Sequence, residues 1–189
     1  MSVLHEIRFY LLIAIVALLS WWLAQTNQAL QATVKLAENS PDLFSKGYYK
    51  LRMDVDGLPK SELVADNMQH YSKDGSSHLQ KPVMSLYKPN QAPWVIQSET
   101  GIMAGDGDNL QLNGKVFISR DAYGKNSALS IDTADLRVKL STHFAETLAS
   151  TEIISPPNKT SGKGMEVTFD SPIHLKLLST VKGRYELNK

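Results

Sequence analysis

A regular alternation of apolar and polar residues is the feature that most limits how this chain can fold. Between residues 49 and 55, Tyr, Leu, Met and Val alternate with Lys, Arg and Asp, and an Asp-Gly pair follows. A period of two places the apolar side chains on one face of a β-strand, whereas an amphipathic helix needs a period near 3.6. The same alternation recurs at residues 110–118, 136–140, 165–169, 173–177 and 180–187.

The large domain is therefore predicted to be built from strands. Gly, Pro, Asn and Asp separate the alternating segments, as they do at turns, and no window with a helical period follows residue 33. We expect residues 45–189 to form an antiparallel all-β domain. An open sheet of this kind leaves unpaired backbone groups on its first and last strands, and these edges need a cover or a partner.

An uncharged stretch precedes the alternating segments. Residues 9–24 read FYLLIAIVALLSWWLA, with Ser20 as the one clearly polar residue. At ~1.5 Å per residue, a helix of this length falls slightly short of the ~30 Å hydrocarbon core of a bilayer. The flanking residues can make up the difference, because Trp21 and Trp22 suit the interface with water. Residues 1–24 are predicted to be a cytoplasmic stub followed by a transmembrane helix.

A cleaved signal peptide is the competing interpretation of that stretch. Cleavage needs small residues at positions −3 and −1, and cuts after Ala24, Ala29 or Ala32 each leave an unsuitable residue at −3. The sequence therefore favours an uncleaved anchor, followed by a linker over residues 25–44. With so few residues before the helix, we expect a cytoplasmic N-terminus and a large domain on the other side of the membrane.

Composition argues against several classes of function. With 20 basic and 19 acidic side chains and no basic block, the chain lacks the charge that a nucleic-acid-binding protein needs. Without cysteine it has no disulfide, thiolate metal site or cysteine nucleophile. Its five histidines lack metal-ligand spacing, and no nucleophile stands beside a base in any motif. No enzymatic activity, metal or cofactor is expected.

Several short motifs, taken in order behind the apolar stretch, resemble one family. They are Tyr71-Ser72, Pro82-Val83, Pro93-Trp94, Leu110, Leu112, Gly114 and Val116 at alternate positions, Thr133-Ala134-Asp135, Gly164-Met165, and Val181-Lys182-Gly183 with Tyr185. Their order and spacing resemble the LptC family, the single-pass inner-membrane component of the Gram-negative lipopolysaccharide export bridge. The resemblance covers the anchor and residues 45–187, and it is weakest at residues 121–127 and in the loop at Pro156-Pro157.

The resemblance implies a fold and a set of partners. The fold would be a twisted, V-shaped β jelly roll in the periplasm, with an apolar groove that passes lipopolysaccharide along. Its N-terminal edge would join an inner-membrane ABC transporter, a permease pair with an ATPase, and its C-terminal edge a periplasmic bridge protein of the same fold. The residues expected to contact these partners are Tyr49, Lys50, Arg52, Lys182, Arg184 and Glu186.

Strand parity suggests which side chains point inward. Each of these is either ordinary core or a contact to acyl chains, and the sequence leaves both alternatives open. A membrane-anchored scaffold with a closed core is the alternative function, and an envelope hydrolase a more distant one. The balanced charge indicates that lipid would be held mainly by apolar contact. The inward residues are predicted to be Leu51, Met53, Val55, Leu79, Leu112, Val116, Ile118, Leu175, Val181 and Tyr185.

Overall fold

The chain divides into two units, Met1–Glu38 and Asn39–Lys189. The computed structural model describes residues 11–23, 40–124, 126–170 and 172–186. In the first unit, residues 11–23 form a helix, and the ends of the predicted anchor and most of the predicted linker lie outside the described residues. Within the described part, no helix combines the length and the apolar character that crossing a membrane requires.

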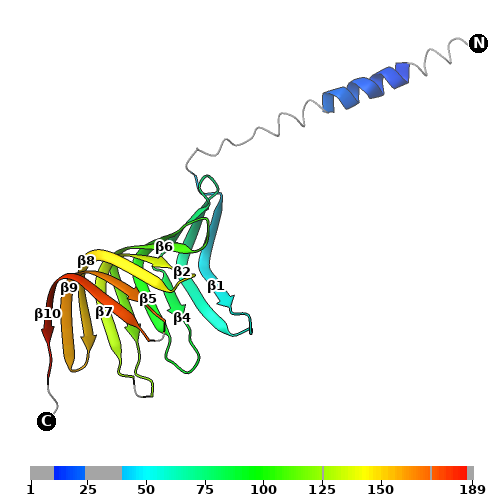
Figure 1. Ribbon diagram of the computed structural model, residues 1–189. Coiled ribbons are helices and arrows are strands. Elements are labelled where there is room, and N and C mark those ends of the chain that lie inside the picture. The colour runs from blue at the N-terminus through cyan, green and yellow to red at the C-terminus, as the bar shows by residue number, and fades with distance from the viewer. Residues whose placement is uncertain (1–10, 24–39, 125, 171, 187–189) are drawn as a thin grey trace, which may run out of the picture. The chain divides into compact units, whose positions relative to one another are not determined.

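The second unit is a single antiparallel sheet of ten strands (Figure 1). Its order is β1-β2-β3-β5-β6-β7-β8-β9-β10, with β4 beside β2 and β5. The all-β antiparallel prediction is confirmed, and the jelly-roll topology stays a prediction. The strands are β1 (Leu43–Met53), β2 (Pro59–Tyr71), β3 (Ser76–Gln80), β4 (Val83–Leu86), β5 (Trp94–Met103), β6 (Asn109–Arg120), β7 (Leu129–Lys139), β8 (Phe144–Ser155), β9 (Asn158–Thr168) and β10 (His174–Arg184).

Two details of the predicted strands are wrong. The expected strands over residues 173–177 and 180–187 are one strand, β10, because a register shift between Ser179 and Lys182 interrupts its pairing with β9 without ending it. Val55 lies beyond β1 in a turn and is 101% exposed. The turn forms there because the Asp54 carboxylate accepts the backbone N–H groups of Asp56 and Leu58, at 2.9 and 2.8 Å.

A line of irregular pairing crosses the sheet from β3 to β10, and we call it the bend line. β3 and β4 both lie between β2 and β5, and Lys81 and Pro82 separate one strand from the other. A bulge bends its strand, so bulges aligned across neighbouring strands bend the whole sheet. The register shifts lie between Ser98 and Thr100, Leu112 and Lys115, Asp132 and Arg137, Thr147 and Ser150, and Ser179 and Lys182.

The two halves of the bent sheet bury their apolar faces against each other. Trp94, at the start of β5, packs on Phe169, just after β9, with ring centroids 5.2 Å apart. Burial of a large apolar side chain contributes about 1.5–3 kcal/mol, so this shared face is the main source of stability. Its largest fully buried members are Met84, Ile96, Leu110, Leu112, Val116, Ile118, Ile131, Leu136, Met165, Val167 and Phe169.

Polar groups freed at the bend line find partners within it. The hydroxyls of Thr133 and Thr151, both buried, lie 3.0 Å apart. Thr147 Oγ1 donates to the Ala134 carbonyl at 2.6 Å. A buried polar group left unpaired costs about 1–3 kcal/mol, and these hydroxyls remove that cost where regular pairing fails.

Gly114 is one residue that constrains the bend. Its φ is 75°, and a Cβ there would lie 2.9 Å from Glu99 Oε2. Its N–H donates to the Asp135 carboxylate at 2.9 Å, on a residue whose own φ is 49°. A glycine is needed because a left-handed conformation costs other residues about 1–2 kcal/mol.

We therefore expect Gly114→Ala to lower the free energy of unfolding by about 1–2 kcal/mol, measured by urea denaturation of the full chain. Gly124→Ala is the control: its φ of 59° carries the same conformational cost, but nothing lies within 4 Å of the added Cβ, so it lacks the contact that Gly114 makes with Glu99. It should cost clearly less. Equal losses in the two variants would show that the bend line is not specially constrained.

Candidate functional site

The interior between the two halves of the sheet is the first candidate site. Leu79, Leu112, Val116 and Ile118 point into it and are 3%, 1%, 2% and 0% exposed. Leu175 is half-buried and packs against the same cluster. Their side chains face the core as strand parity predicted, but they contact one another in a closed interior. Contact with acyl chains stays a prediction for all five.

The inner face of β1 differs from the prediction. Tyr48 pairs with Ala65, and Lys50 pairs with Leu63, in β2. Directly paired residues share a face of the sheet, and both β2 residues are buried in the core. Tyr48, Lys50 and Arg52 therefore face the interior. Consistent with this placement, burial raises the pKa of Tyr48.

The apolar residues of β1 consequently face outward. Leu51 pairs with the outward-facing Glu62, and Met53 is 53% exposed. The prediction that Leu51, Met53 and Val55 point inward is wrong. Alternation shows that a strand has two different faces. Pairing with β2 decides which face meets the core, and in β1 that face carries Lys50 and Arg52.

The far end of β10 is exposed as well. Val181 is 57% exposed and Tyr185 is 70% exposed, so neither belongs to the buried core. The Tyr185 ring lies over Gly183, where an added Cβ would come within 2.6 Å of it. This part of the strand offers apolar surface beside a free edge.

β1 and β10 end the strand order, so each has one side without a strand partner in the described chain. The residues predicted to bind partners lie at these edges: Tyr49, Lys50 and Arg52 in β1, and Lys182 and Arg184 in β10. Glu186 follows β10, and its N–H donates to Asn158 Oδ1 at 3.2 Å. That these residues contact other proteins stays a prediction.

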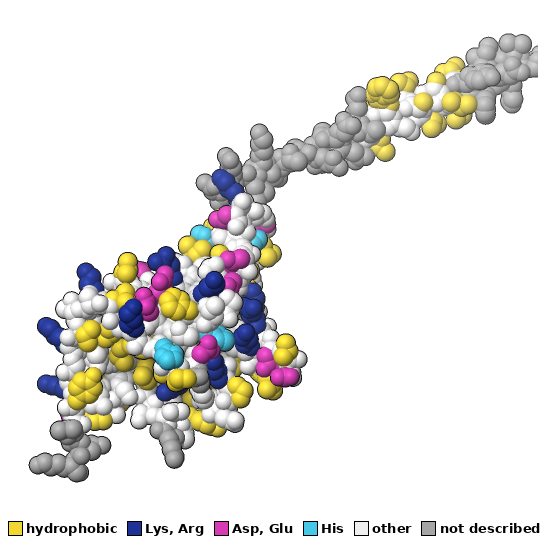
Figure 2. Space-filling model, viewed as in Figure 1, with side chains coloured by type: hydrophobic (Ala, Val, Ile, Leu, Met, Phe, Trp, Pro, Cys, Tyr) yellow, Lys and Arg dark blue, Asp and Glu magenta, His cyan; other side chains and the backbone are white. Residues whose placement is uncertain are grey.

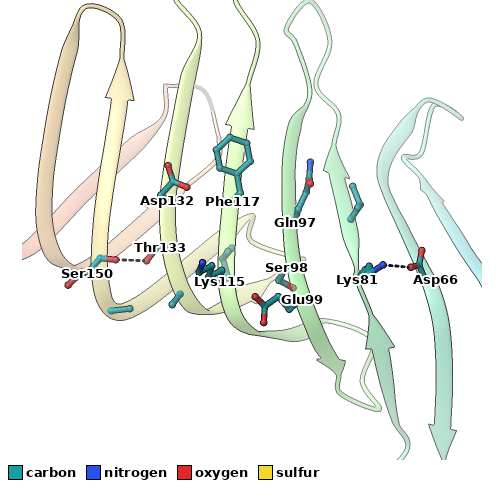
Figure 3. Close-up of a pocket in the computed structure, with 14 residues that line it drawn as sticks. Asp66, Lys81, Gln97, Ser98, Glu99, Lys115, Phe117, Asp132, Thr133 and Ser150 are labelled. Atoms are coloured by element: carbon teal, nitrogen blue, oxygen red, sulfur yellow. Dashed lines mark hydrogen bonds and ion pairs between the residues drawn. The ribbon is translucent and has the colours of Figure 1, made fainter.

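A broad hollow on the outer face of the sheet is a second candidate (Figure 3). It holds about 1010 Å³ and carries charges of both signs around Phe117, which is 40% exposed. Asp66 and Lys81 form an ion pair at one end of it, at 3.3 Å. Positive and negative side chains are likewise interspersed over the face shown in Figure 2. The hollow therefore favours no single ligand charge.

Three loops meet in an ionic cluster that the sequence did not reveal. Asp170, after β9, accepts hydrogen bonds from Lys88, after β4, and from His143 Nδ1, in the turn between β7 and β8, the latter at 3.0 Å. The bond from Lys88, together with that from His143, holds the pKa of Asp170 below its usual value. The cluster ties together loops from both halves of the bent sheet.

Other chemistry finds little support among the residues described. They contain no group of three or more His, Asp or Glu side chains that could hold a metal ion. The Asp170 carboxylate, whose pKa is lowered, is held by contacts between loops. The geometry thus points to the apolar interior and the two free edges.

Comparison with known families identifies the chain. A family model described as "Lipopolysaccharide-assembly, LptC-related" matches residues 9–186. The chain belongs to the LptC family. LptC membership implies a role in lipopolysaccharide transport and an association with the inner membrane of the cell envelope. LptC proteins are transport components and are not known as enzymes. A search of curated proteins gives no match.

In this LptC-family chain, the cluster around Asp170 should stabilise the closed sheet in a pH-dependent way. Because the folded state lowers the pKa of Asp170, its contribution is present above about pH 4 and is lost as the pH falls through the lowered value. We expect Asp170→Asn to cost about 0.5–1 kcal/mol at pH 7, with the difference from wild type smaller at pH 2.

Urea denaturation at both pH values measures this effect. Asp66→Asn is the matched control, because its ion pair with Lys81 is far more exposed, at 59% and 71%. That control should change stability less at pH 7. A difference between Asp170→Asn and wild type that stayed constant down to pH 2 would contradict the assignment.

Proposed function

We propose that the chain is a membrane-anchored carrier of lipopolysaccharide. In this proposal, residues 9–24 anchor it in the inner membrane and the β domain lies in the periplasm, where its two halves part into a V to receive acyl chains. The observation that carries the proposal is a single sheet with one continuous apolar face and a free edge at each end. Family membership supplies the identity of the lipid.

Acyl chains can replace the apolar contacts that the two halves of the sheet make with each other. The halves meet through apolar side chains, and exposure of that surface to water costs roughly 25 cal/mol per Å². Acyl chains that enter between the halves cover the same surface and offset this cost. Since charge is not the main source of binding, the lipid can also be released to the next protein.

The two edges can join the domain to two different partners. An extended segment of another protein can add to an exposed sheet edge through backbone hydrogen bonds. We propose that β1 joins the inner-membrane ABC transporter, with its permease pair and ATPase, and that β10 joins the periplasmic bridge protein. Strand addition at both ends would extend the apolar face from one protein into the next.

A scaffold with a closed core is the second candidate, and one observation favours it. The core side chains are packed to nearly zero exposure, and the cavity lined by Leu63, Met84, Met103 and Leu140 holds only about 10 Å³. In that case the domain would link the transporter to the bridge without holding lipid. The following experiment separates the two functions.

A photo-crosslinking amino acid at Leu175 should capture lipopolysaccharide in cells during active export. Leu175 suits the test because it faces the interior and is only half-buried, so the larger side chain can be accommodated. Phe117 is the control, since it lies on the outer face and should give only background capture. Equal capture at both positions, or none at Leu175 while export proceeds, would refute an internal lipid path.

A chain that ends at Leu178 should lose its association with the bridge protein and keep its contact with the transporter. The truncation removes the exposed half of β10, whereas Leu175 and Leu177, which pack against the core, remain. Co-purification of both partners from cell membranes measures the effect. Undiminished recovery of the bridge protein with the truncated chain would show that β10 is not its docking edge.

A further inference from the structure

We propose that Lys50 and Arg52 form a phosphate-binding site at the rim of the interior, which holds the anionic headgroup of a lipid whose acyl chains lie inside. This inference rests on the proposed function and deepens it, because it assigns a role to two side chains in lipid recognition. It replaces the expectation that both residues contact a protein partner.

The site follows from the face of β1 that meets the core. Lys50 and Arg52 line one small cavity together with the apolar side chains of Leu63, Met84, Met103 and Leu140. Lys50 Nζ lies 3.7 Å from the position that a Cβ on Gly107 would occupy, so it reaches from β1 to the turn between β5 and β6. The two cations therefore stand where the apolar interior meets the free edge.

The two carboxylates next to Gly107 are held by hydrogen bonds from neutral donors rather than by the cations of β1. Asp106 accepts the backbone N–H groups of Asp108 and Asn109, at 2.8 and 3.1 Å, and the Asn109 amide at 2.6 Å. Asp108 accepts the N–H and the hydroxyl of Ser141, at 2.6 and 2.8 Å.

The Glu62 carboxylate, on the outer face of β2, accepts the Tyr87 hydroxyl. In the described part of the chain, no carboxylate lies within ion-pair distance of Lys50 or Arg52. Both cations thus keep donors that no ion pair within the described chain occupies, and these donors can bind an anion from outside it.

The arrangement fits an amphiphile with a phosphorylated head. Arg presents a planar fork of donors that matches phosphate, and Lys adds a compact positive charge. The interior next to the two cations offers apolar surface for acyl chains. Long basic side chains also cover apolar edges with their stems while the charged ends stay in water. The experiment must therefore separate the loss of charge from the loss of this cover, and Gln substitutions keep most of the stem.

The test compares two lipids with the full chain purified in detergent. Bisphosphorylated lipid A and enzymatically dephosphorylated lipid A are each added, and native mass spectrometry measures the retained lipid. Lys50→Gln with Arg52→Gln should weaken retention of the phosphorylated lipid at least about tenfold, because bonds to charged groups contribute about 1.5–3 kcal/mol. Retention of the dephosphorylated lipid should not change.

The matched control removes two cations from the outer face. Lys60→Gln with Lys115→Gln changes the net charge equally, outside the proposed site, and should retain both lipids as wild type does. Excess inorganic phosphate should fail to displace lipid A, because the acyl chains contribute most of the binding. Full displacement by phosphate would show an anion site that does not recognise lipid and would overturn the proposal.

The remaining outcomes are distinct. If the double variant at β1 retains phosphorylated lipid A as well as wild type does, the phosphate site is refuted and the carrier function stands. If the outer-face control loses as much binding as the β1 variant, the effect is general electrostatics and the site is also refuted. If wild type retains neither lipid, the carrier function itself falls.

Discussion

The bend line is the constraint on which the rest of this structure depends. An antiparallel sheet of long strands with one apolar face, and no helix packed on it among the described residues, has to cover that face with itself. Aligned register shifts in β5 to β10, with Lys81 and Pro82 between β3 and β4, allow the strands to turn while they stay paired. At the bend line, Gly114 avoids the close contact that a side chain would make, and the buried threonine hydroxyls form hydrogen bonds there.

A sheet that covers its own apolar face also has an interior that can open. The halves are joined by continuous strands at the bend and by the ionic cluster at Asp170, and the core buried between them is a cluster of apolar side chains. Apolar contact is not directional, so acyl chains can replace it without leaving a polar group unpaired. The bend therefore connects stability with the carrier function proposed for this LptC-family chain: the surface that holds the fold closed is the surface offered to lipid.

The sequence predicted the strands better than it predicted their faces. Alternation identified the all-β fold and the inward direction of Leu112 and Ile118, because these central strands bury one whole face. It failed at β1, where Leu51 faces outward and Lys50 inward, since an edge strand takes its orientation from pairing with its neighbour. The cluster of Lys88, His143 and Asp170 could not be foreseen, because only the folded topology brings these loops together.

If the domain carries lipid in its interior, the two halves of the sheet separate when lipid is bound. Because the chain has no cysteine, spin labels can be placed on Asp56→Cys, in the turn between β1 and β2, and Thr142→Cys, in the turn between β7 and β8. Both positions are exposed. The distance between the labels, measured by pulsed electron resonance on the full chain, should increase when lipid A is added. An unchanged distance distribution in samples that demonstrably retain lipid A would contradict this account.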